Sequence, residues 1–157
     1  VKDSAQATDL TVGYGDNDVD PHRCDPLLMT GFPRATAARA VPVLLLHTWP
    51  FHRHAAYLAQ VFDQVFVDVG LATHNTGALS TGLTRELLEM APWSKVLYSS
   101  DAFGLPELYR LGAHFFRRSL GTVLDELVGA GAIGEDDAAY VAGLVTPDHA
   151  RRAHRLT

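Results

Sequence analysis

Short apolar runs alternate along the chain with longer stretches of mixed residues. The run at 41–46 contains only apolar residues and leads directly into His47, and the run at 65–69 is interrupted by a single acid. Uninterrupted apolar runs of this length are typical of strands that are buried on both faces. Shorter β-type runs occur at 10–12 and 96–98. The pattern therefore predicts four short strands.

The stretches between and after these strands have helical periodicity. Ala55, Leu58, Ala59 and Phe62 recur at three- and four-residue spacing within 52–62, which is the pattern of the buried face of an amphipathic helix. The same kind of spacing and the turn residues around it predict further helices at 83–90, 106–128, 135–144 and 147–156.

Two places carry weaker helical signals. The stretch 25–40 is weakly helical, and we expect Gly and Pro to interrupt it at 31–33. Ser80, Thr81 and Thr84 are candidate caps for the helix that follows them.

The order of the elements predicts the fold class. Strands that alternate with helices favour an α/β fold in which the strands pair in parallel through right-handed crossovers. Four strand–helix units followed by C-terminal helices are compatible with half of an eight-unit barrel and with a small doubly wound sheet. Periodicity alone leaves both open.

Composition and charge narrow the function classes. The chain has 157 residues, enough for one domain, and is 47% hydrophobic and 20% charged. A formal net charge of -5 disfavours nucleic-acid and anionic-membrane binding, since both need a basic surface. Neither a membrane-spanning run nor a signal pattern is evident, and Cys24 is the single cysteine. We expect a cytoplasmic protein without disulfides.

Candidate chemistry lies where two predicted strands end. His47 follows one strand, and Asp101 closely follows another. In parallel sheets the carboxyl ends of the strands share one edge, where active sites are built. Asp101 could bind a metal or take a proton from water, and His47 could bind a metal or donate to a substrate oxygen. The alternatives are a helix cap for Asp101 and a structural histidine at a strand end for His47.

Four further residues are candidates for the substrate pocket. His52 and His74 could face a substrate, although an exposed loop position is an alternative for His74, which lies in a polar loop predicted at 73–77. Trp49 and Phe103 flank the two strand-end residues and could form an apolar wall, or simply pack.

Three motifs taken in order carry a resemblance to a known family. They are Gly-Tyr-Gly-Asp at 13–16, the run 45–53 around His47, and the run 95–107 around Asp101. Together they resemble the metal-dependent amidohydrolase superfamily, most closely its amidohydrolase-2 type, and the resemblance continues to 150–152. It implies that 1–157 is a single domain forming part of a TIM-like (β/α) barrel, the C-terminal half with strands five to eight.

The resemblance also implies a site and an activity. His47 matches the sixth-strand histidine and Asp101 the eighth-strand aspartate, both expected to hold a divalent metal such as zinc. Thr11 stands where a fifth-strand histidine is expected, and the first-strand His-x-His pair has no counterpart. The implied activity is attack of metal-activated water on a C–N or related bond of a small molecule.

Two questions stay open in the sequence. The alternative function is that of a non-catalytic remnant serving as a structural or interaction module. In either case we expect a half barrel to pair with a second copy or with a missing N-terminal half, because its edge strands are unpaired. The substrate, and hydrolysis as against decarboxylation, are not determined.

Overall fold

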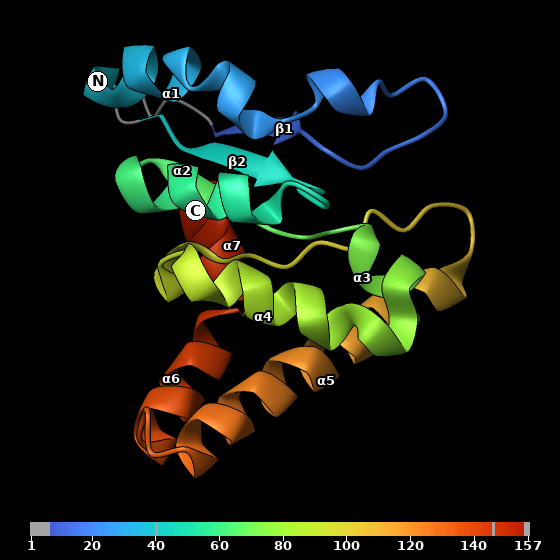
Figure 1. Cartoon of the computed structure of the whole chain (residues 1–157), viewed down its shortest axis with the longest axis vertical. Helices are drawn as coiled ribbons and strands as arrows, with labels where there is room; N and C mark the ends of the chain where they lie inside the picture. Colours follow the sequence, from blue (N-terminus) through green and yellow to red (C-terminus); the bar gives the residue numbers. More distant parts are fainter. Residues whose placement is uncertain (1–6, 40, 146, 156–157) are drawn as a thin grey trace.

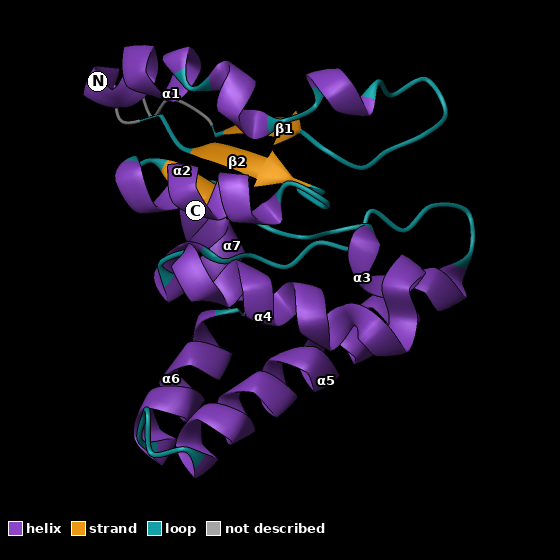
Figure 2. Cartoon of the chain, in the orientation of Figure 1, coloured by secondary structure: helices purple, strands orange, loops and turns teal. Residues whose placement is uncertain are grey.

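A parallel sheet forms the centre of the computed structural model, which describes residues 7–39, 41–145 and 147–155. Its strands are β1 (Thr8–Thr11), β2 (Val43–Leu46) and β3 (Val65–Val67), in the order β1-β2-β3. Both pairings are parallel, with Leu10 opposite Leu45 and Leu45 opposite Val67 (Figure 2). The predicted α/β class and parallel pairing are therefore confirmed.

The predicted fourth strand is reduced to one bridge. Val96 pairs in parallel with Val67, and the Leu97 N–H donates to the Val67 carbonyl at 2.8 Å. After Leu97 the chain leaves the ladder and turns toward Asp101. The segment still occupies the next position in the sheet, and its outer edge has no strand beside it among the described residues.

The long helices lie close to their predicted positions, and helices make up most of the structure (Figure 1). They are α1 (Gly31–Thr36), α2 (His52–Val61), α3 (Ala72–Thr76), α4 (Ser80–Met90), α5 (Pro106–Gly129), α6 (Glu135–Leu144) and α7 (Pro147–Ala153). The prediction for the last helix extended to residue 156, which lies outside the described residues.

Three local predictions were wrong. Gly and Pro do not interrupt a helix at 31–33, because α1 begins at Gly31 and Pro33 lies in its first turn, where a missing N–H is tolerated. The loop predicted at 73–77 is largely the short helix α3. Ser80 does not cap α4: its hydroxyl is buried and hydrogen-bonds to the Ser119 hydroxyl of α5 at 2.8 Å.

One face of the sheet, which we call the outer face, carries the main hydrophobic core, and we call the opposite face the inner face. Alternate strand residues point to this face and belong to one buried cluster with side chains of α2, α4 and α5. The fully buried side chains of this layer include Val43, Leu45, Leu58, Val65, Val67 and Leu87. The Lys95 ammonium joins the layer to α2 by donating to the carbonyls of Ala59 and Phe62, which lie at the end of that helix.

The inner face is covered by α7, which Figure 1 draws behind α2. Leu44 and Leu97 contact Ala153 in a second, smaller cluster, and the Phe66 ring meets His149 edge-on at 6.3 Å. The described sheet is therefore covered on both sides, by the helical layer that includes α2 and α4 on one face and by the short helix α7 on the other. Among the described residues, no helix combines the length with the hydropathy that a bilayer-crossing segment requires.

Candidate active site at the carboxyl edge of the sheet

His47 ends β2 in an unusual backbone conformation. Its φ is +59°, in the left-handed region that non-glycine residues rarely adopt. The conformation is fixed from the next strand, because the His47 N–H donates to Asp68 Oδ1 at 2.9 Å and the Thr48 hydroxyl donates to the Asp68 carbonyl at 2.5 Å. The imidazole is 5% exposed. Asp68 thus fixes the backbone of His47 by binding the His47 N–H and the neighbouring Thr48 hydroxyl.

Gly70 makes room for the imidazole of His47. A Cβ at this position would lie 2.0 Å from His47 Nδ1, and the φ of Gly70 is +40°. Both the space and the backbone conformation therefore require glycine.

The hydrogen bonds of the His47 ring determine its tautomer. Nδ1 accepts the Leu71 N–H at 3.2 Å, so in the neutral ring the hydrogen is on Nε2. Nε2 lies 3.5 Å from Asp101 Oδ2. Asp101 also has a left-handed backbone, with φ +50°, and its side chain is 54% exposed. The structure therefore brings the two predicted strand-end residues together, with a hydrogen donor facing a carboxylate.

Asp68 is a site residue that the sequence prediction missed. It is 1% exposed, and burial raises the pKa of its carboxyl, while the nearby Ser99 hydroxyl and the contacts with His47 act in the opposite direction. Among the described residues neither Asp68 Oδ2 nor Ser99 Oγ makes a well-aligned hydrogen bond, although the two groups are close. The available signal was that Asp68 is the single acid within the apolar run 65–69.

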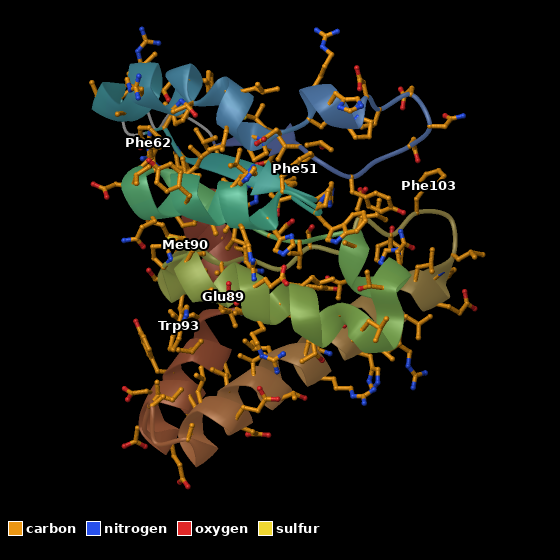
Figure 3. All side chains as sticks on the ribbon, viewed as in Figure 1. Phe51, Phe62, Glu89, Met90, Trp93 and Phe103 are labelled. Atoms are coloured by element: carbon orange, nitrogen blue, oxygen red, sulfur yellow. The ribbon has the colours of Figure 1, made fainter. Side chains whose placement is uncertain are left out.

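The remaining candidate residues are distributed differently. His74 lies on α3, close enough to Asp101 for the carboxylate to affect its pKa. Trp49 packs edge-on against Tyr14 at 5.4 Å. His52 is not brought to His47 and Asp101: its Nε2 lies 2.7 Å from Glu86 Oε2 in the helical layer. Phe103 does not form a pocket wall, since it is 90% exposed on the loop before α5 (Figure 3).

The described residues do not by themselves fit a metal centre. They contain no group of three or more His, Cys, Asp or Glu side chains placed to hold an ion. His47 and Asp101 are two donors, whereas a catalytic zinc normally has three protein ligands and an open position. Thr11, at the end of β1, is exposed and supplies only a hydroxyl. In addition, the hydrogen on His47 Nε2 occupies the position that a metal would need.

A cavity beside α5 lies away from this pair. It has a volume of about 530 Å³ and is lined mainly by apolar residues of α5 and of the segments that follow it, with Tyr98 and Arg117 as its polar members. Neither His47 nor Asp101 lines it. Because chemistry needs the titratable pair, we place the candidate active site at the edge of the sheet and not in this cavity.

Comparisons with known proteins identify the class that this fold and edge resemble. No family model matches the chain. The fold is similar to a structure from Lactobacillus casei ATCC 334 that is provisionally described as a metal-dependent hydrolase, with a TM-score of 0.87 and 30% identity over 95% of this chain. This similarity supports the hydrolase superfamily expected from the motifs.

Two further proteins are similar to the chain. The protein fluG of Emericella nidulans is 29% identical over 153 residues. Amidohydrolase 2 from Bifidobacterium longum subsp. infantis is 17% identical over 82% of the chain, with a TM-score of 0.43. The chain spans 39% of the Lactobacillus protein, 17% of fluG and 46% of the Bifidobacterium protein.

Proposed function

We propose that the chain carries the His47–Asp101 part of the catalytic centre of an amidohydrolase-like hydrolase, acting on a C–N or related bond of a small molecule. The observation that carries this proposal is the approach of His47 Nε2 to Asp101 Oδ2 at 3.5 Å, with both residues held in left-handed backbone conformations. Strained backbone concentrates at functional sites, where the surrounding structure maintains it. The fold similarity to the Lactobacillus hydrolase adds support.

The same proposal assigns the fold. We take residues 1–157 as one domain that corresponds to the C-terminal half of a TIM-like barrel, with β1, β2, β3 and the Val96 segment as strands five to eight. The support is the parallel order of these segments and the lack of a further described strand beside β1 or Val96. A second copy or an N-terminal half would then close the sheet.

The proposed chemistry uses the two side chains in complementary roles. The Asp101 carboxylate takes a proton from the attacking water as the water oxygen bonds to the substrate carbonyl carbon. The His47 Nε2–H donates to the carbonyl oxygen as negative charge develops on it. When the C–N bond breaks, Asp101 returns the proton to the departing nitrogen, which restores the starting protonation state.

A divalent metal, with zinc tested first, is the cofactor that similarity to a metal-dependent hydrolase suggests. His47 and Asp101 are the donors that this chain would offer, and His47 would do so in place of its Nε2–H role above, because that nitrogen cannot carry a hydrogen and bind an ion at once. Since two donors do not complete such a site, at least one more would have to come from outside the described residues. None of the proton transfers above is assigned to the ion.

The test is hydrolysis of 4-nitrophenyl acetate and 4-nitroacetanilide by the purified chain, with added Zn²⁺ and with EDTA. We expect Asp101→Asn and His47→Gln each to lower the rate by about 100-fold or more, which is the usual effect of removing an acid–base or oxyanion group. Asp25→Asn is the matched control, because Asp25 pairs with His54 outside the site. Hydrolysis no faster than buffer, or equal in all variants, would overturn the proposal.

One observation favours a second candidate, a non-catalytic structural or interaction module. It is the lack of a three-donor group among the described residues. This candidate predicts no hydrolysis of either compound, and less than a tenth of an equivalent of metal by elemental analysis after equilibration with Zn²⁺. Metal close to one equivalent that is lost in Asp101→Ala would exclude it.

A further inference from the structure

Three side chains converge on one position of α5, beside the candidate site. Gly112 is buried in this helix, and a Cβ there would lie 2.9 Å from the Tyr98 hydroxyl, 3.2 Å from Ser100 Cβ and 3.6 Å from His74 Nδ1. Glycine in the middle of a helix costs roughly 1 kcal/mol relative to alanine. At Gly112 the missing side chain lets the Tyr98 hydroxyl approach the helix next to His74.

Two of the converging polar atoms are left without a partner. His74 Nδ1 and the Tyr98 hydroxyl oxygen are both buried, and neither makes a well-aligned hydrogen bond to another described residue. The Ser100 hydroxyl accepts the Ala102 N–H at 3.2 Å and lies close enough to Tyr98 to affect the pKa of the phenol, but it makes no well-aligned hydrogen bond to the Tyr98 hydroxyl and leaves His74 Nδ1 unsatisfied. Buried polar atoms are nearly always hydrogen-bonded, to protein or to an ordered small molecule. A phenol hydrogen and an imidazole lone pair are complementary, so a single oxygen between them would satisfy both.

We propose that one small oxygen, from a bound water or a hydroxyl group of the substrate, bridges the Tyr98 hydroxyl and His74 Nδ1. Tyr98 is then a positioning residue that fixes His74 as the neutral tautomer with its hydrogen on Nε2. Resting on the proposed function, this Nε2–H is a hydrogen donor for a substrate oxygen beside Asp101, and it selects substrates that carry a carbonyl or carboxylate there.

The charge states of the two groups agree with this arrangement. Burial lowers the pKa of His74, against the opposing effect of the Asp101 carboxylate. Burial raises the pKa of the Tyr98 phenol, against the effects of Ser100 and Arg117. A neutral imidazole can accept at Nδ1 and donate at Nε2, and a protonated phenol can donate to the bridging oxygen.

Ring nitrogen NMR of His74 tests the bridge without any turnover. In the wild type near neutral pH, with glycerol present so that a bridging oxygen is available from either source, we expect a single neutral tautomer with an unprotonated Nδ1, and in Tyr98→Phe under the same conditions a mixture of the two tautomers. Tyr109→Phe is the matched control, because Tyr109 is an exposed tyrosine on α5, and it should leave the His74 signal unchanged. The same His74 signal in the wild type and Tyr98→Phe would overturn the proposal.

A glycine pair provides a second variant should Tyr98→Phe unfold. Gly112→Ala should displace the Tyr98 hydroxyl and therefore change the His74 tautomer ratio. Gly121→Ala, in the same helix with open space around its Cβ position, should leave the ratio as in the wild type. Equal ratios in both variants would contradict the bridge.

The source of the oxygen is decided on the free protein. A single tautomer together with magnetisation transfer from water to the Tyr98 hydroxyl identifies a bound water. A mixture that becomes single only on addition of glycerol, used as a hydroxyl probe, identifies a substrate hydroxyl. A mixture in both conditions overturns the bridge. If the tautomer result holds while nitrophenyl substrates are not hydrolysed, the proposed function fails and the role of Tyr98 stands.

Discussion

The two faces of the sheet are covered in very different ways. On the outer face, fully buried side chains such as Val43, Leu45 and Val67 belong to one apolar cluster with residues of α2, α4 and α5. On the inner face, the short helix α7 covers Leu44 and Leu97 and brings titratable groups with it. These groups are His149 against Phe66, and His154 Nδ1 at 3.7 Å from Asp9 Oδ1.

The two faces should therefore differ in how their contribution to stability depends on pH. Apolar packing depends weakly on pH, whereas a buried histidine links stability to proton binding. The carboxyl edge lies between these extremes, since strained backbone and partnerless polar atoms are retained there next to the apolar layer. Strained backbone and unsatisfied polar atoms of this kind are expected where a functional site is supported by a well-packed scaffold.

The largest effect should come from opening the outer layer. Leu87 of α4 is completely buried in the main core, and Leu87→Ala should lower the free energy of unfolding by about 2–5 kcal/mol, because it removes buried apolar atoms and leaves a cavity. Urea denaturation measures the change, which should be the same at pH 5.5 and pH 7.5. Leu79→Ala is the control, since Leu79 is 81% exposed and the change should stay within about 0.5 kcal/mol. If the loss of unfolding free energy in Leu87→Ala varied strongly with pH, the outer face would not be the pH-independent layer that this comparison requires.

A smaller loss is expected at the carboxyl edge. Gly70→Ala would place a methyl group 2.0 Å from His47 Nδ1 on a backbone with φ +40°. We expect the free energy of unfolding to fall by about 2–3 kcal/mol, from steric overlap and from the left-handed conformation. The His47 ring signals in NMR should shift in parallel, because the ring has to move.

Gly82→Ala in α4 is the matched control for Gly70→Ala. Gly82 is exposed and has open space around its Cβ position, so alanine should stabilise the helix by up to about 1 kcal/mol. Should Gly70→Ala prove as stable as the wild type, His47 would not be held as the structure describes.

The strands and long helices were predictable because their signals are local. The apolar run 41–46 and the spacing in 52–62 each report burial of their own residues, and β2 and α2 formed there. His47 and Asp101 could be paired in advance because parallel strands end at one edge. Asp68 and Gly70 could not, because their roles depend on His47, whose backbone N–H reaches Asp68 and whose ring reaches Gly70 only through tertiary packing.

The same argument explains why the structure does not bring the pocket candidates His52 and Phe103 to His47 and Asp101. His52 was selected because it lies within the matched run 45–53, but the side on which it faces depends on the rotation of α2, which turns it toward Glu86 of α4. Phe103 was selected as a neighbour of Asp101, and the glycine turn at Gly104 directs the loop outward. Neighbours in sequence share a region of the fold, yet the backbone at each position decides where the side chain lies.

The smallest effect should appear on the inner face, as a pH dependence. His149 is 7% exposed, and burial lowers the pKa of its imidazole from 6.5; Arg152 acts in the same direction, while the Ser94 backbone opposes it. As the pH falls below about 6.5, the unfolded chain binds a proton that the folded chain does not, so stability is lost down to the folded pKa. This slope cannot exceed about 1.4 kcal/mol per pH unit for one group.

His149→Gln should therefore lose less stability between pH 7.5 and pH 5.5 than the wild type in urea titrations. His22→Gln, on an exposed turn, should lose as much as the wild type, and an identical loss in His149→Gln would mean that α7 does not bury this histidine against the sheet.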